Sequence, residues 1–231
     1  PELEYTSFAD KYFIGQPINV TTGFIFEGID PETGLAKFND LNGDQEISEE
    51  EDFTYLGTTT PKFYGGILNT LTYKNWSLDI FFQFVKQKGT TLNYGYQSLP
   101  YGFMYNNDVS ALNRWTPENR YTDIPIATAS AAGDAYTSYS QWRVSSANWK
   151  DASYIRLASA RFGYTFNKNN MPIKGLENLS LYVTGTNLYL WTKYNGYDPD
   201  VSSNSSSTVR RKDDGAYPKN RTIAFSLSTK F

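Results

Sequence analysis

The 231-residue chain contains no cysteine and no histidine. Without cysteine it has no disulfide framework, no thiol nucleophile and no thiolate ligand for zinc. Without histidine it also lacks the most common general base, the Ser-His-Asp triad and every imidazole metal ligand. We therefore predict that the protein is not an enzyme and has no catalytic or cofactor-binding residues.

Concentrated positive charge and long apolar runs are also missing. The formal net charge is −3 with Lys and Arg scattered, so the sequence predicts no nucleic-acid partner. No run of 18 apolar residues exists, which excludes a transmembrane helix. The opening residues PELEYTSFADK have neither the basic start nor the apolar core of a signal peptide. Two interpretations follow: a cytosolic protein, or a sequence that lacks its true beginning.

Aromatic residues, by contrast, are abundant, and they recur in segments of strict apolar alternation. The chain has 19 Tyr and 15 Phe, and five segments place an apolar residue at every second position, namely residues 63–73, 76–86, 154–166, 179–192 and 223–231. This period predicts β-strands. The strands are about twice as long as the usual 5 to 6 residues, and such a length fits a tilted strand that crosses a membrane.

The connections between these segments alternate between short and long. Lys74 and Asn75 join the first two and about a dozen residues join the third and fourth, whereas residues 87–153 and 195–220 form long loops. Short turns on one side and long loops on the other are typical of outer-membrane barrels. Aromatic residues mark the segment ends, as interfacial girdles do: Tyr73, Trp76, Trp191 and Tyr194. A β-sandwich with an aromatic core is the alternative.

One acidic stretch, DLNGDQEISEEED, resembles the twelve-residue calcium loop of an EF-hand. Within residues 40–51 the ligand positions hold Asp40, Asn42, Asp44, Glu46 through its carbonyl, and Glu51, with Asp52 as a substitute for Glu51. Gln45 stands where the motif has glycine. We predict a structural Ca²⁺ site; a solvated acidic loop is the alternative.

The long loops are rich in aromatic residues among Ser, Asn and Gly, a mixture that suits contact with a polar ligand or a protein. The residues singled out for such contact are Tyr101, Trp115, Trp142 and Trp149. The alternative is that they pack the loops against themselves. The carboxylate pairs Asp198 with Asp200 and Asp213 with Asp214 lie in Ser-rich loops and do not predict catalysis.

An ordered series of motifs covers nearly the whole chain. It includes DLNGDQEIS, NRWTPENRYTDIP, SYIRLASARFGYTF, LYVTGTNLYLWTKYNGYDPDV and GAYPKNRTIAFSLSTKF. In this order they resemble the C-terminal portion of SusC/RagA-type TonB-dependent outer-membrane transporters. No single motif would be enough to establish the resemblance.

The resemblance implies an all-β fold: the C-terminal strands of a large antiparallel transmembrane β-barrel of roughly 22 strands, closed by an N-terminal plug. Residues 1–62 would form an extracellular segment that carries the acidic loop, and residues 63–231 about five barrel strands with long extracellular loops. The plug is absent from this sequence. A terminal aromatic such as Phe231 resembles the end by which barrels are recognised for assembly.

The resemblance further implies a function in the outer membrane of a Gram-negative cell. The transporter would import glycan or peptide oligomers together with a SusD-like lipoprotein, energised by TonB-ExbB-ExbD through the missing N-terminal region. Two alternatives stay open from the residues themselves: a secreted, calcium-stabilised β-sandwich that binds carbohydrate, and a surface adhesin built on the same strands.

Overall fold

The computed structural model describes residues 13–17, 19–91, 99–167, 171, 173, 176–200, 215 and 217–230. The chain divides into two compact units. One unit, called here the sheet unit, comprises residues 61–87, 152–193 and 218–231. The other, the loop unit, comprises residues 1–60, 88–151 and 194–217. In the described part of the chain, no helix is both long and apolar enough to cross a bilayer.

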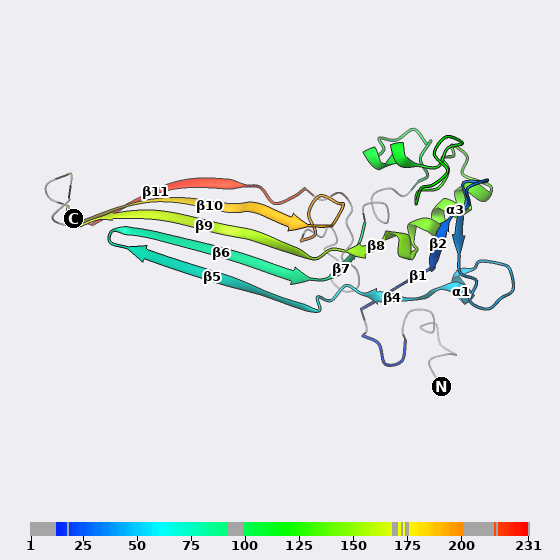
Figure 1. The fold of residues 1–231 in the computed structure, drawn as a ribbon, viewed down its shortest axis with the longest axis horizontal. Helices are drawn as coiled ribbons and strands as arrows, with labels where there is room; N and C mark the ends of the chain where they lie inside the picture. Colours follow the sequence, from blue (N-terminus) through cyan, green and yellow to red (C-terminus); the bar gives the residue numbers. More distant parts are fainter. Residues whose placement is uncertain are drawn as a thin grey trace. The chain divides into compact units, whose positions relative to one another are not determined.

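The sheet unit is one antiparallel sheet with the strand order β11-β10-β9-β6-β5 (Figure 1). Its strands are β5 (Phe63–Tyr73), β6 (Trp76–Lys86), β9 (Tyr154–Phe166), β10 (Asn178–Thr192) and β11 (Thr222–Lys230). These are the five strands predicted from apolar alternation, with identical bounds for the first three and one-residue differences for the last two. Phe231 lies outside the described residues.

The turn between β5 and β6 has the two residues predicted for it, and its backbone explains why they suffice. Lys74 has φ of 55°, which a two-residue turn of the kind that joins twisted strands requires. The carbonyl of Asn75 then accepts a hydrogen bond from the amide of Thr165 at 2.9 Å, which ties the turn to β9. The hairpin is therefore fixed to its neighbour strand at the turn as well as along its length.

Asn187 interrupts the apolar alternation of β10, and the structure has a β-bulge at this point. The register between β9 and β10 shifts between Thr186 and Tyr189, and Asn187 has φ of 52°. Its side-chain amide donates to the carbonyl of Asn220 at 3.0 Å, beside the start of β11. Asparagine tolerates the left-handed region better than most residues, so the sequence suits the bulge.

The loop unit consists of short strand pairs and helices for which the sequence shows no clear periodic pattern. Three two-stranded sheets pair β1 (Val20–Gly23) with β4 (Thr54–Thr58), β2 (Phe26–Ile29) with β3 (Ala36–Phe38), and β7 (Lys88–Thr90) with β8 (Trp149–Asp151). The helices are α1 (Glu49–Asp52), η2 (Val109–Asn113), α3 (Asp134–Arg143) and η3 (Ser146–Asn148).

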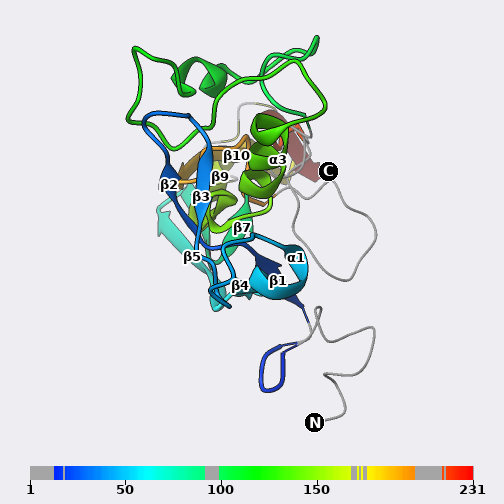
Figure 2. The ribbon, with the colours of Figure 1, turned by 90° about the vertical axis from the view of Figure 1, so that its right-hand side faces the viewer.

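An aromatic core holds the loop unit together. It is formed by Phe24, Phe38, Tyr101, Tyr139, Trp142 and Ala147. Figure 2 shows α3 next to β3, where the amide of Ala36 donates to Ser138 Oγ at 2.6 Å. Because the core joins the N-terminal segment to the long loop after β6, residues 88–151 fold with residues 1–60. Each of the two compact units is therefore made of several chain segments, whereas the sequence predicted two consecutive segments that meet between residues 62 and 63.

Candidate functional site

One face of the sheet unit is apolar and exposed. The register places residues of this face side by side in rows across the strands, for example Trp76, Tyr164, Leu181 and Leu227, and Leu78, Phe162, Val183 and Phe225. Phe225 is 81 % exposed and Ile67 59 %. Large apolar side chains this exposed over a continuous surface indicate a membrane or protein contact. A β-sandwich would bury this face, so that alternative does not fit the sheet.

Aromatic rings gather toward both ends of this face. Near the β5–β6 turn, the Trp76 ring stacks on Phe162 with centroids 5.0 Å apart and meets Tyr164 edge-on at 4.5 Å. Near the opposite end, the ring centroids of Tyr189 and Trp191 lie 4.6 Å apart. Two aromatic bands that flank an aliphatic middle are the arrangement of a barrel wall between two membrane interfaces.

The opposite face of the sheet carries polar groups. Thr70 Oγ1 donates to Asp79 Oδ1 at 2.8 Å, and Asp79 lies opposite Arg161 on the next strand. The Arg161 guanidinium lies over the Tyr182 ring, 3.8 Å from its centroid. Tyr182 lies opposite Gly163, where a Cβ would come within 2.4 Å of the ring. Glycine at this position therefore lets the tyrosine lie flat against the sheet.

The acidic loop adopts a tight turn around Asp40. Its carboxylate oxygens accept the amides of Gly43 at 2.7 Å and Gln45 at 2.8 Å. Gln45 has φ of 71°, so this residue takes up the left-handed conformation for which calcium loops use glycine. Gln45 in place of the glycine of the motif therefore keeps the turn. The left-handed conformation costs a residue with a side chain some backbone strain.

Asp44 and Glu51 come together in this loop. The side-chain amide of Asn42 donates to Asp44 Oδ2 at 2.9 Å and to Glu51 Oε2 at 2.7 Å. Asp44, which also accepts the amide of Glu46 at 2.8 Å, has a lowered pKa chiefly for that reason. The neighbouring Asp44 carboxylate raises the pKa of Glu51. Two carboxylates held this close favour any cation that enters between them.

Asp52, considered a substitute for Glu51, has another role. It is fully buried, and its two oxygens accept the amides of Leu41 at 2.7 Å and Ser48 at 2.9 Å. Both oxygens therefore close the loop upon itself. Within the described ranges, no group of three or more acidic side chains is placed to hold a metal ion. The calcium site stays a prediction.

The four aromatic residues predicted to contact a ligand or partner are buried. The exposed fraction is 1 % for Tyr101, 8 % for Trp115, 2 % for Trp142 and 6 % for Trp149. The polar atom of Trp142 faces the interior as well, since its Nε1 donates to the carbonyl of Asp123 at 2.8 Å. Direct contact would need exposed side chains, so these residues follow the alternative in which the loops pack against themselves.

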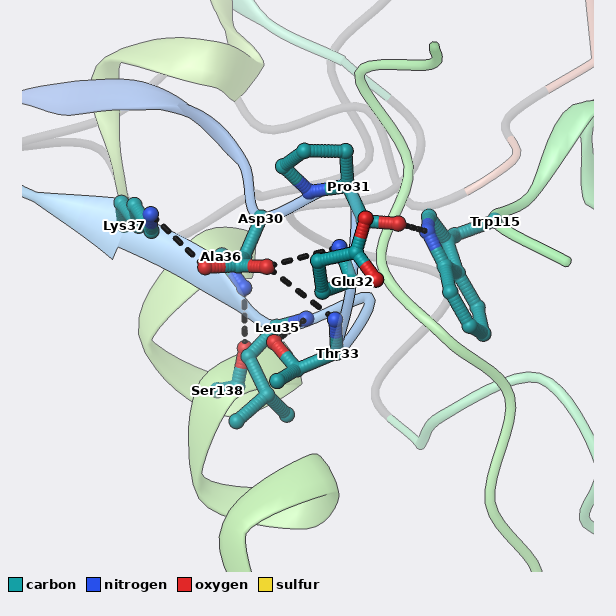
Figure 3. Close-up of polar contacts among 9 residues, drawn as sticks. All are labelled: Asp30, Pro31, Glu32, Thr33, Leu35, Ala36, Lys37, Trp115 and Ser138. Carbon is teal, nitrogen blue, oxygen red and sulfur yellow. Dashed lines mark hydrogen bonds and ion pairs between the residues drawn. The ribbon is translucent and has the colours of Figure 1, made fainter. Parts of the chain in front are cut away.

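Trp115 shows this packing role in detail (Figure 3). Its Nε1 donates to the carbonyl of Pro31 at 3.2 Å, at the tip of the β2–β3 hairpin. Gly34 has φ of +75°, and a Cβ there would lie 2.6 Å from the Trp115 ring. The tryptophan therefore covers the glycine, and the hairpin tip is held by a residue about 80 positions further along the chain.

Asp30 organises the same hairpin from within (Figure 3). Its carboxylate pairs with Lys37 Nζ at 2.7 Å and accepts the amides of Glu32 at 2.8 Å and Thr33 at 3.1 Å. Lys37 and these amides hold the pKa of Asp30 well below its usual range. The Asp-Pro start of the turn was the sequence signal that could have located this hairpin.

The carboxylate pairs show no catalytic arrangement. Asp198 is buried and its Oδ1 accepts the amide of Asp200 at 3.0 Å, which is a local turn. Asp213 and Asp214 lie outside the described residues.

Known proteins resemble the chain in sequence over most of its length, although no protein-family model matches it. It is 33 % identical to TonB-dependent receptor P26 of Formosa agariphila over 96 % of the chain, and 34 % identical to TonB-dependent receptor P3 of the same organism over 87 %. It spans 23 % of the first relative and 19 % of the second, so it corresponds to about a fifth of their length.

Solved structures share the fold. The RagAB peptide transporter matches 92 % of the chain with a TM-score of 0.71 at 21 % identity, and the chain covers 23 % of that protein. The RagAB peptide importer in its closed-closed state matches 98 % with a TM-score of 0.67 at 20 % identity, and 25 % of that protein is covered.

Proposed function

We propose that this chain, which belongs to the SusC/RagA-type TonB-dependent receptors, forms part of an outer-membrane barrel through which nutrients are imported. The observation that carries the proposal is the exposed apolar face of the sheet unit, flanked by aromatic rings, in a chain homologous to TonB-dependent receptors. Lipid would cover this face, while the face with Asp79 and Arg161 would line the lumen.

The strand order gives the topology of the loops. The β5–β6 turn and the β9–β10 connection leave one end of the antiparallel sheet, and the segments of the loop unit leave the other. With the C-terminus periplasmic, as in the family, the loop unit is extracellular. Its aromatic core would keep long loops folded where they meet the environment.

The cargo and the partners follow from the family. The neighbours in fold include a peptide transporter, which supports peptide oligomers as cargo, and glycan oligomers are the other cargo that the family resemblance implies. Import would use a SusD-like lipoprotein at the surface and TonB-ExbB-ExbD for energy. The complete receptor, rather than this part of it alone, would bind both partners. Import would need no catalytic residue from this chain.

Uptake by cells tests the proposal. Cells that lack the receptor would lose uptake of labelled peptide or glycan oligomers, and the intact gene would restore it. A protonophore would abolish the restored uptake, because TonB-linked import depends on the inner-membrane proton gradient. Co-purification of a lipoprotein with the receptor tests the partner separately. Uptake that survives both gene removal and the protonophore would contradict the proposal.

A further inference from the structure

The face of the sheet unit that carries Asp79 and Arg161 is not polar throughout. Side chains alternate between the two faces of a strand, so Tyr64 and Leu68 of β5 lie on the same face as Thr70. Tyr64 is 78 % exposed and Leu68 66 %. Large apolar side chains this exposed beside polar neighbours indicate a contact surface.

A glycine joins these two side chains into one surface. Gly66 lies between them on β5, and a Cβ at this position would lie 2.6 Å from the ring of Phe81. Phe81 is the partner of Leu68 on β6, so its ring reaches across Gly66 toward the space between Tyr64 and Leu68. Tyr64, Leu68 and Phe81, called here the β5 patch, therefore form a continuous apolar surface.

The opposite edge of the sheet has no such surface. There β11 carries Ala224, Ser226 and Ser228 on the same face (Figure 1). Both β5 and β11 lack a neighbour on one side, so their edge position does not explain the difference. A strand paired with β5 would lie about 4.8 Å to its side, in the plane of the sheet, and would not cover side chains that project from the face.

The position of the β5 patch limits what can cover it. In the proposed barrel this face lines the lumen, where lipid does not reach it. The chain spans 23 % of TonB-dependent receptor P26 and 19 % of TonB-dependent receptor P3, so most of the polypeptide of such a receptor lies outside these residues. A segment of that polypeptide inside the lumen would bury its own apolar side chains together with those of the patch.

We propose that an apolar segment of the N-terminal part of the receptor packs against the β5 patch inside the lumen, whereas the wall at β11 faces water. The proposal rests on the proposed function, because it places this face inside a barrel. It assigns two roles to the lumen wall: β5 and β6 hold the receptor's own chain, and β11 borders the space left for cargo.

The first test measures water access in the whole receptor, made without other cysteines and reconstituted in vesicles. Single cysteines replace Tyr64, Leu68, Ala224 or Ser226, and each reacts with a water-soluble maleimide. Residues 64 and 68 should react about tenfold more slowly than 224 and 226, because a covered cysteine reacts only when the contact opens. Leu68→Asp should remove the protection of a cysteine at residue 64, whereas Ser226→Asp should keep it.

The second test identifies what covers the patch. A photoreactive benzoylphenylalanine at residue 68 of the whole receptor should form a cross-link with a peptide from the N-terminal part of the same polypeptide, identified by mass spectrometry. The same group at residue 226 should form much less of this product.

The contrary outcomes are distinct. Equal reaction rates at residues 64, 68, 224 and 226 would overturn the inference while leaving the barrel. Cross-links from residue 68 to residues 88–151, or to added peptide cargo, would show another occupant and would overturn it as well. A spin label at residue 226 that collides mainly with dissolved oxygen would place this face in lipid and would refute the proposed function itself.

Discussion

The two units of the chain treat their large apolar residues in opposite ways. In the sheet unit Phe225, Leu227 and Ile67 are more than half exposed, whereas in the loop unit Phe24 and Tyr139 are almost wholly buried. A unit that buries its aromatic residues folds as water-soluble domains do. A sheet with exposed apolar side chains is stable only where lipid or another apolar surface covers them. The sheet unit is therefore suited to an apolar environment and the loop unit to water.

The comparison is tested most strongly by removing the core of the loop unit. Trp142→Ala should destabilise that unit by about 3–5 kcal/mol, because it empties a packed aromatic site. Proteases added outside cells should then cut within residues 88–151, while the barrel keeps its heat-dependent mobility on gels. Tyr121→Ala, at a 94 % exposed position, should change stability by less than about 0.5 kcal/mol.

Loss of the barrel signal in Trp142→Ala, with Tyr121→Ala unaffected, would show that the two units do not fold separately. Equal protease resistance in both variants would show that the aromatic core is not what stabilises the loops.

The sheet unit is tested by placing a charge on either face of β11. Phe225→Arg should cost about 2–4 kcal/mol of membrane stability, the value for a charge on a lipid-facing strand. Ser226→Arg, one residue further and on the opposite face, should cost much less. Folding yield in vesicles, titrated with urea, measures both. Equal losses would contradict the assignment of faces.

The third test concerns the acidic loop of the loop unit. If it binds calcium, Ca²⁺ at 100 times its dissociation constant should stabilise the folded receptor by about 2.7 kcal/mol. Glu51→Gln should abolish this gain because it removes one of the two close carboxylates, whereas Glu50→Gln should not. Calorimetry that detects no Ca²⁺ uptake would leave a solvated acidic loop as the explanation.

The smallest expected effect is the pH dependence of the β2–β3 hairpin. The pKa of Asp30 is lowered by Lys37 and two amides, so its contribution is present above the ordinary value of 3.8 and is lost as pH falls below it. Hydrogen exchange at the amide of Gly34, which donates to the Asp30 carbonyl at 2.8 Å, reports on the hairpin. The protection gap between the receptor and Asp30→Asn should close toward acid; a constant gap would contradict this.

The sheet could be predicted from the sequence because a strand with one apolar face shows its period locally. Residues 154–166, for example, carry their own signal at every second position. The loop unit could not be predicted in this way. Its core joins Phe24, Tyr101 and Tyr139, which are far apart in the chain, and α3 is a ten-residue helix rich in Ser, Thr and Tyr. Its stability comes from distant partners rather than from its own pattern.

The acidic loop shows the same limit on a smaller scale. The spacing of Asp40, Asp44 and Glu51 in the sequence was enough to predict the position of the turn. In the structure the turn forms around Asp40, and the carboxylates of Asp44 and Glu51 lie close together. The role of Asp52 depends on where the amides of Leu41 and Ser48 lie in space, and no spacing rule contains that. Likewise, the four loop aromatics could not be classed as buried or exposed until their distant partners were known.

The most direct test of the central claim, that one face of the sheet meets lipid, uses the absence of cysteine from the chain. Single cysteines along β11, at residues 223–229, would each carry a spin label in the receptor reconstituted in vesicles. Labels at Ile223, Phe225, Leu227 and Thr229 should collide mainly with dissolved oxygen, and labels at Ala224, Ser226 and Ser228 with a water-soluble nickel complex. Collision rates without this alternation, or with its phase reversed, would contradict the claim.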